Sequence, residues 1–495
     1  MRFTLLLAAA VLGMMLSPES AHGEEPTPMN TSRQDIAVDQ ALHERLGGEP
    51  ICRVGVVLEE DNKSRLEALL TPGQYSLKTS GGVIPLVLSE PLLLVFEVHD
   101  ERITATRPHD NLRFAPPSAM IRLECSSPPE RLAPRMGVLL KGCVTGRGFH
   151  WQKEVDFYFP YHLEFHQRNG RLIVVNEIPM EPYLACVVTS EMSKDCPPEF
   201  IKAQATAARS WMQVFLKNKH RGEPYTICND DDCQRYQGTT WLEQSVADAV
   251  RECRGMFLVN PDGSVCPAYY SKSCGGIMER GTNVFGAGAE ALSEACDAPA
   301  GSLTERFNPV TEDTIREWVT GEWVKHSDSY CSPNVVPEDT LKRYIGAVDE
   351  SGRYYRWHVR YERRELEQML RTKAQIADLA EFLDFEPGPR GNSGRLMALT
   401  IVYRDDAGST RTHEIRREYN IRKALHEKFL FSGAFVWDFE RDAHGRIAAV
   451  TLRGAGWGHG AGLCQIGALG MALKGARYED ILKHYYSGAQ LKRAY

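Results

Sequence analysis

A glutamate and two cationic side chains occur close together in the chain between residues 187 and 211. Glu191 falls in the last turn of a short predicted helix, in which Leu184 and Val188 recur at helical spacing. The negative end of the helix dipole favours the protonated form of a carboxylate at this position. The segment therefore contains a candidate general acid.

A second helix is predicted directly after Pro197 and Pro198, because proline is tolerated in the first helical turn. Its buried stripe consists of Ile201, Ala205, Ala208, Met212 and Phe215, and its polar stripe of Lys202, Thr206, Arg209 and Gln213. If Arg209 lies within a few ångströms of Glu191, its charge favours the ionised form of the carboxylate and so opposes the effect of the helix dipole. The alternative interpretation is a helix pair with a solvated, charged face.

A second group of chemically active residues surrounds two cysteines. Cys228 and Cys233 are separated by four residues, with Asp232 beside the second cysteine and His220 eight residues before the first. Two thiolates, an imidazole and a carboxylate can complete a closed, structural zinc site. A disulfide between the two cysteines is the alternative, because exported chains form disulfides. Cys274 is a further candidate ligand or disulfide partner.

The first 23 residues have the pattern of a secretory signal peptide. Arg2 precedes an apolar run from Phe3 to Leu16, and the small residue Gly23 marks a cleavage site. No later stretch approaches the roughly 18 continuous apolar residues of a membrane-spanning helix. We therefore expect a protein exported to the periplasm or cell envelope, without a stable membrane span. The net charge of −7 and the lack of a basic tract indicate that nucleic acid is not a partner.

The order of the predicted elements indicates an α+β fold with more than one domain in 495 residues. After a flexible lead at 24–48, short apolar runs between turn residues predict a β-rich module at 49–150. The region 151–495 mixes helices and strands and begins with a hairpin whose turn is Asn169-Gly170. A polar, helix-leaning stretch at about 298–390 is expected to be a lobe or insertion.

Seven segments of the second region, in chain order, resemble the SpoIID/LytB family of exported bacterial proteins that act on peptidoglycan. They are YLACVVTSEM, PPEFIKAQATAARSW, CNDDDCQRYQG, YYSKSCGG, YNIRKALHEKFLFSGAF, GWGHGAGLCQIGALGMALKG and YEDILKHYYSG. The resemblance covers residues from about 155 to 495. It implies a β-rich N-terminal module followed by a mixed α/β, two-lobed, SpoIID-like catalytic domain with a substrate groove.

The activity implied by the resemblance is that of a lytic transglycosylase, with Glu191 as the single acid and base. Protonated Glu191 would give its proton to the glycosidic oxygen between N-acetylmuramic acid (MurNAc) and N-acetylglucosamine (GlcNAc). The carboxylate would then take a proton from the C6 hydroxyl of the sugar, which attacks C1 and forms a 1,6-anhydro ring. Because the substrate supplies the nucleophile, neither a second carboxylate nor a cofactor is required. The resemblance also implies that the preferred glycan strands are stripped of stem peptides.

The resemblance also suggests residues that bind the glycan. Lys202, Gln204 and Arg209 match family residues at the groove, where cations can hold the lactyl carboxylate of muramic acid. The glycines at every second position of GWGHGAGLCQ permit close approach either to a polysaccharide or to a neighbouring strand. Further candidates are His459 and Gln465 of this loop, and Tyr270, Ser273 and Tyr485, for which buried core positions are the alternative.

Two alternative functions remain open. LytB-type relatives are described as amidase modifiers, so the chain could bind glycan and activate or recruit an N-acetylmuramoyl-L-alanine amidase without cleaving. A metal-dependent hydrolase using the Cys228 and Cys233 region is the third hypothesis. In some family members a histidine directly precedes the second cysteine of a zinc site, where this chain has Asp232.

Overall fold

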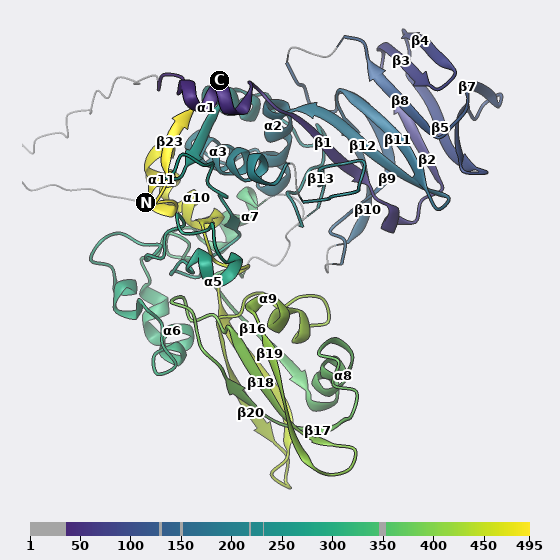
Figure 1. Cartoon of the computed structure of the whole chain (residues 1–495). Coiled ribbons are helices and arrows are strands. Elements are labelled where there is room, and N and C mark those ends of the chain that lie inside the picture. Colours follow the sequence, from purple (N-terminus) through teal and green to yellow (C-terminus); the bar gives the residue numbers. More distant parts are fainter. Residues whose placement is uncertain (1–35, 128–130, 149–151, 217–218, 231, 346–352) are drawn as a thin grey trace, which may run out of the picture. The chain divides into compact units, whose positions relative to one another are not determined.

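The computed structural model describes residues 36–127, 131–148, 152–216, 219–230, 232–345 and 353–495 (Figure 1). The predicted signal peptide at 1–23 lies outside the described residues, as does the first half of the lead predicted at 24–48. The end of that lead is not irregular but forms helix α1 (Gln40–Leu46). The Asp39 carboxylate accepts a hydrogen bond from the Leu42 N–H at 2.9 Å and so caps the first turn of this helix.

The N-terminal half of the chain forms two antiparallel sheets, which confirms the prediction of a β-rich N-terminal part. In the seven-stranded sheet the order is β13 (Ile227–Cys228), β1 (Ile51–Val57), β12 (Arg171–Pro179), β11 (His162–Arg168), β8 (Met120–Cys125), β3 (Gly73–Thr79) and β4 (Gly82–Leu88), with only β13 parallel to its neighbour. In the six-stranded sheet the order is β10 (Lys153–Phe159), β9 (Val138–Thr145), β2 (Arg65–Leu70), β5 (Leu92–His99), β6 (Arg102–Arg107) and β7 (Leu112–Ser118). Phe96 of one sheet stacks on Phe165 of the other, with ring centroids 3.6 Å apart.

These sheets continue past the domain boundary predicted at residue 150. Three strands that were expected to open the catalytic region belong to the N-terminal sheets instead. β10 pairs with β9, β11 pairs with β12, and β12 pairs with the whole of β1, with Ile51 opposite Pro179. The predicted turn between β11 and β12 is present at Asn169 and Gly170. Both residues have positive φ, 51° and 73°, as a tight hairpin turn requires.

The two helices predicted around Glu191 follow β12 directly. They are α2 (Met180–Glu191) and α3 (Pro198–Phe215), and all residues from Phe200 to Met212 are buried. Helix α3 packs against α2, α4 (Gln244–Glu252), α10 (Gln465–Leu473), α11 (Tyr478–Tyr485) and β14 (Met256–Val259), which pairs with β23 (Gln490–Arg493). The polar stripe of α3 is therefore not a solvated face, and its charges must find partners inside the protein.

Two short strands bring distant segments together beside these helices. β15 (Tyr270–Ser271) runs parallel to β22 (Leu463–Cys464), which leads into α10. Between them in the chain lie the short helices α5 (Gly281–Phe285), α6 (Ile315–Thr320) and α7 (Glu338–Tyr344) and a pair of small sheets.

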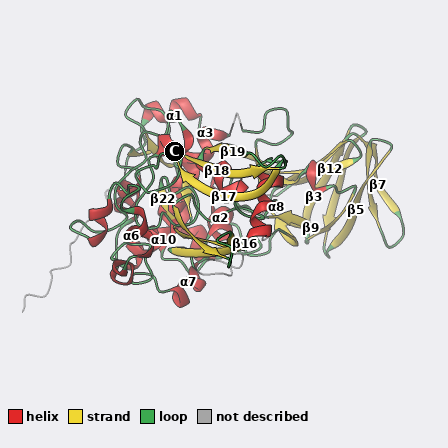
Figure 2. Ribbon diagram, turned by 90° about the horizontal axis from the view of Figure 1, so that it is seen from below, coloured by secondary structure: helices red, strands yellow, loops and turns green. Residues whose placement is uncertain are grey.

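The small sheets show where the predicted lobe ends. One has the order β16 (Arg356–Glu362), β21 (Ile447–Ala455), β20 (Phe435–Arg441), and the other β17 (Leu379–Pro387), β18 (Ala398–Asp405), β19 (Thr410–Arg416). Strands β17 to β19 lie side by side in both views (Figure 1; Figure 2). Helices α8 (Arg363–Lys373) and α9 (Glu418–Ala424) share one buried core with both sheets, including Leu366, Phe382, Leu399, Phe435 and Leu452. The strands after residue 394 thus complete the lobe predicted at 298–390.

Among the described residues, no helix is both long and apolar enough to cross a membrane.

Candidate active site

The carboxylate of Glu191 is held at the C-terminal end of α2 by two donors from other parts of the chain. Its Oε1 accepts hydrogen bonds from the Arg235 backbone N–H at 3.0 Å and from the Tyr270 hydroxyl at 3.1 Å. Within the described part of the chain, no hydrogen bond is made to Oε2. Glu191 is only 8% exposed. One carboxylate oxygen is therefore fixed by two donors, whereas the other has none within the described residues.

Tyr270 reaches Glu191 because β15 runs past the end of α2. Burial, followed by the Glu191 carboxylate, raises the pKa of Tyr270 well above its ordinary value, so the phenol stays protonated and donates. Lys272, two residues further along, points its Nζ to the Glu191 backbone carbonyl at 3.0 Å. This lysine was not among the predicted site residues. The period of two along an extended segment was the available signal, because it places Lys272 on the same side as Tyr270.

Arg209 does not face Glu191, which corrects the prediction that it binds substrate. Its guanidinium is fully buried and donates two hydrogen bonds to the Glu181 carboxylate at the start of α2, from Nε to Oε1 at 2.8 Å and from Nη2 to Oε2 at 2.7 Å. Its Nη1 donates to the Met256 carbonyl at 3.0 Å, and Tyr495 donates to Glu181 at 2.9 Å. Arg209 therefore joins α3 to α2 and β14 and, through Glu181, to Tyr495.

The other two predicted groove residues of α3 are also buried. Lys202 forms ion pairs with Glu199 and with Glu252, the latter at 3.2 Å. Gln204 accepts a hydrogen bond from Gln465 of α10 at 3.5 Å, so these two candidates lie together. The Gln204 Nε2 is buried and has no hydrogen-bond partner among the described residues. A buried unpaired amide donor is costly. On the same helix the Thr206 hydroxyl is likewise buried without a hydrogen-bond partner among the described residues.

The glycine-rich loop packs against the segment that carries Tyr270. A Cβ at Gly462, where φ is 71°, would lie 2.1 Å from the Tyr269 carbonyl oxygen, and one at Gly460 would lie 2.3 Å from the Arg395 guanidinium carbon. The structure thus favours close approach to a neighbouring strand as the reason for these glycines.

His459 of the same loop supports the backbone of Tyr270. Its Nδ1 accepts from the Ala461 N–H at 3.1 Å, so Nε2 carries the proton and donates to the Tyr270 carbonyl at 3.0 Å. Burial, then the charges of Arg422 and Arg395, lowers the pKa of His459 to about 3. The imidazole is therefore neutral and acts as a positioning group for Tyr270.

Two further candidates have structural roles in place of the predicted contact with sugar. Ser273 is fully buried, and its hydroxyl accepts from the Gly275 N–H at 3.3 Å. Tyr485 is also fully buried and donates to Asp297 at 2.6 Å. For both residues the buried position considered as the alternative is the one observed.

The predicted metal ligands come together in one place. One potential ligand atom from each of His220, Cys228, Asp232 and Cys233 lies within 4.8 Å of the others, and the His220 Nε2 is 3.1 Å from the Cys233 Sγ. A hydrogen bond from Cys233, opposed by burial and assisted by His220, lowers the pKa of Cys228 to about 6. An imidazole, two sulfurs and a carboxylate at this spacing suit a closed, tetrahedral zinc site.

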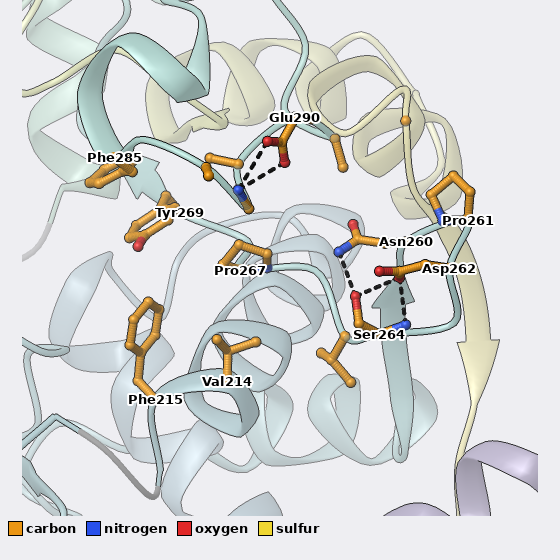
Figure 3. Close-up of a pocket in the computed structure, with 16 residues that line it drawn as sticks. Val214, Phe215, Asn260, Pro261, Asp262, Ser264, Pro267, Tyr269, Phe285 and Glu290 are labelled. Carbon is orange, nitrogen blue, oxygen red and sulfur yellow. Dashed lines mark hydrogen bonds between the residues drawn. The ribbon is translucent and has the colours of Figure 1, made fainter.

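A cavity of about 740 Å³ is lined in part by Pro267 and Tyr269 and is shown in Figure 3. Its aromatic residues are Phe215, Tyr269 and Phe285, and the rings of Tyr269 and Phe285 stack with centroids 3.5 Å apart. Glu191 is not among the residues that line it. The cavity is therefore distinct from the acid, although Tyr269 adjoins Tyr270 in the chain.

Comparison with known proteins places these features in a family. Residues 168–260 match the SpoIID family, described as Stage II sporulation protein, and residues 314–462 match a domain of unknown function, DUF8618. An uncharacterised protein of Brachyspira hyodysenteriae is 28% identical over 359 residues, which cover 72% of this chain and 78% of that protein. Stage II sporulation protein D of Bacillus subtilis is 24% identical over 335 residues, 65% of this chain and 76% of its own length. The Amidase enhancer of Bacillus subtilis is 26% identical over 312 residues, 62% of this chain and 39% of its own length.

Proposed function

Because the chain belongs to the SpoIID/LytB family, we propose that it is an exported lytic transglycosylase that cleaves the MurNAc-GlcNAc bond of peptide-stripped peptidoglycan. The observation that carries the proposal is the state of Glu191. Its Oε1 is tied to Tyr270 and to the Arg235 N–H, and its Oε2 is left to exchange a proton.

The proposed reaction uses one carboxylate twice. Oε2 of protonated Glu191 donates its proton to the glycosidic oxygen, and the bond between this oxygen and C1 of MurNAc breaks. The resulting carboxylate accepts the proton of the MurNAc C6 hydroxyl, whose oxygen bonds to C1 and gives the 1,6-anhydro end. Tyr270 and Arg235 keep Oε1 in place through both proton transfers, and His459 holds the Tyr270 backbone. Fixed geometry of this kind removes the cost of orienting the acid in each turnover.

The substrate groove between two lobes is part of the same proposal. Supporting features are the Gln204 donor, which has no partner among the described residues, and the aromatic cavity lined by Tyr269, whose rings offer surface for sugar packing. We further propose that His220, Cys228, Asp232 and Cys233 hold a structural zinc ion, whose four ligands leave no open position for catalysis. The ion would fix the loop that supplies the Arg235 N–H.

The decisive experiment incubates the purified mature protein with amidase-treated sacculi and identifies the products by mass spectrometry. We expect anhydro-muramic ends from the wild type and none from Glu191→Gln. Glu243→Gln, which changes an exposed carboxylate of the same type, is the matched control and should cleave normally.

The match to the Amidase enhancer favours one second candidate, a glycan-binding activator of an amidase. Wild-type protein that binds the denuded glycan but forms no anhydro ends, while stimulating an added amidase, would replace the transglycosylase proposal by this one. A water-added product that disappears with chelator would instead favour a metal-dependent hydrolase.

A further inference from the structure

A second group of potential metal ligands lies outside the site described above. Cys274 follows β15, Cys331 precedes α7, and Cys464 ends β22, while Asp297 lies in the loop after α5. Each is no more than 2% exposed. One ligand atom from each of the four lies within 4.8 Å of all the others, although the residues span almost 200 positions of the chain. Such convergence of three thiols and a carboxylate in the interior requires an explanation.

The spacing of these atoms matches tetrahedral zinc. Two sulfurs bound at about 2.3 Å with a tetrahedral angle lie about 3.8 Å apart, and a sulfur and a carboxylate oxygen lie about 3.5 Å apart. The observed separations are 3.8 Å between the Cys274 and Cys331 sulfurs and 3.3 Å from the Cys274 Sγ to the Asp297 Oδ2. A disulfide would need its sulfurs about 2.05 Å apart.

Backbone N–H groups point at two of the sulfurs. The Cys464 Sγ accepts from the N–H groups of Cys274 at 3.2 Å and Gly467 at 3.3 Å, the latter at the N-terminal end of α10. The Cys274 Sγ accepts from the Gly276 N–H at 3.4 Å. Donors and a helix N-terminus favour a thiolate over a thiol.

The carboxylate is oriented in the same way. Asp297 uses Oδ1 to accept from the Tyr485 hydroxyl at 2.6 Å and presents Oδ2 to the sulfurs. The His484 Nε2 lies 3.6 Å from the Asp297 Oδ1 and is buried without a hydrogen-bond partner among the described residues. A Cβ on Gly467 would lie 2.3 Å from the Asp297 carboxylate, so only glycine lets α10 approach it. Outer contacts that fix a ligand in this way accompany metal sites.

We propose that Cys274, Asp297, Cys331 and Cys464 bind a second structural zinc ion, separate from that at His220, Cys228, Asp232 and Cys233. A buried carboxylate is costly without a cation, and a zinc ion at this point would both compensate Asp297 and hold the three cysteines as thiolates. Among the hydrogen bonds of the described residues, Arg356 donates to the Gly275, Tyr355 and Trp318 carbonyls and Arg395 to the Cys274 carbonyl, and neither guanidinium donates to the four ligand atoms. The ion would tie β15, which carries Tyr270, to β22 and to the segment before α7.

The test removes the first site so that the second can be counted alone. In full-length mature protein carrying Cys228→Ser and Cys233→Ser, elemental analysis should find about one zinc per chain. Adding Cys331→Ser or Asp297→Asn should remove it, whereas adding Cys266→Ser, a buried cysteine outside both clusters, should not. Loss of two free thiols without bound metal would show a disulfide and overturn the proposal. Three free thiols at Cys274, Cys331 and Cys464 with no bound metal would also overturn it.

A measurement on the unmutated protein keeps the proposal testable if these variants do not fold. Anomalous diffraction of wild-type crystals at the zinc edge should show a peak between the four side chains. Density for the four residues without such a peak would refute the site.

Discussion

Replacing Arg209 with methionine tests whether this arginine holds the fold together or binds the substrate. The change removes the two bonds to Glu181 and the bond to the Met256 carbonyl. Among the described residues, the Glu181 carboxylate then keeps the Tyr495 hydroxyl and the Gly255 N–H as its donors. Removing one partner of a buried ion pair costs about 3–5 kcal/mol, because the other charge stays uncompensated.

The double variant Arg209→Met with Glu181→Gln isolates that cost. It leaves no buried charge, so it should recover more than half of the stability lost in the single variant. The assay is urea unfolding followed by circular dichroism, with the midpoint and the slope compared among the variants. A single variant within about 1 kcal/mol of wild type that has lost glycan binding would refute the reasoning, and would return Arg209 to the substrate groove.

Three further predictions follow from the site. Glu191→Gln should abolish cleavage while changing the free energy of unfolding by less than about 1 kcal/mol, since an amide fits the same space; a stable variant that still turns over would show that another group is the acid. Tyr270→Phe should lower kcat about 10- to 100-fold, the equivalent of one hydrogen bond to a charged group at about 1.5–3 kcal/mol; unchanged kcat in the sacculus assay would contradict a role for this hydroxyl. Because the pKa of His459 is about 3 in the folded protein and about 6.5 when unfolded, only the unfolded chain gains a proton between these values, so stability falls as pH falls. The free energy of unfolding should be lower at pH 5 than at pH 7 by at most about 2 kcal/mol, and by less because the ring is partly exposed. In His459→Gln the free energy of unfolding should fall less between pH 7 and pH 5 than in the wild type; an equal fall in both proteins would refute this origin of acid sensitivity.

The features that depend on local pattern could be predicted from the sequence. The Asn169-Gly170 turn was predicted from residue preference alone, and α3 begins at Pro198, where a first-turn proline is tolerated. Four residues around Cys228 meet because they are close in the chain. Such features need no knowledge of distant partners.

The pairing of charges across the fold could not be predicted in this way. The spacing on α3 places Lys202 and Arg209 on one stripe, but it does not identify the carboxylates that pair with them. Glu181 lies 28 residues before Arg209, and Glu252, which pairs with Lys202, lies on another helix. The second cysteine cluster was missed for the same reason. Its ligands are brought together by the parallel pairing of β15 and β22 and by an inserted segment that contributes Cys331.

The pairing of β1 with β12 and β13 also decides how this protein can be divided. A fragment that starts at residue 151 would keep β12 but lose its neighbour β1, and would expose the backbone donors and acceptors of β12 along a new sheet edge. Unprotected edges of this kind recruit other chains and aggregate. For expression, crystallography or the engineering of chimaeras, the N-terminal sheets and the region that carries Glu191 should therefore be kept together in one fragment.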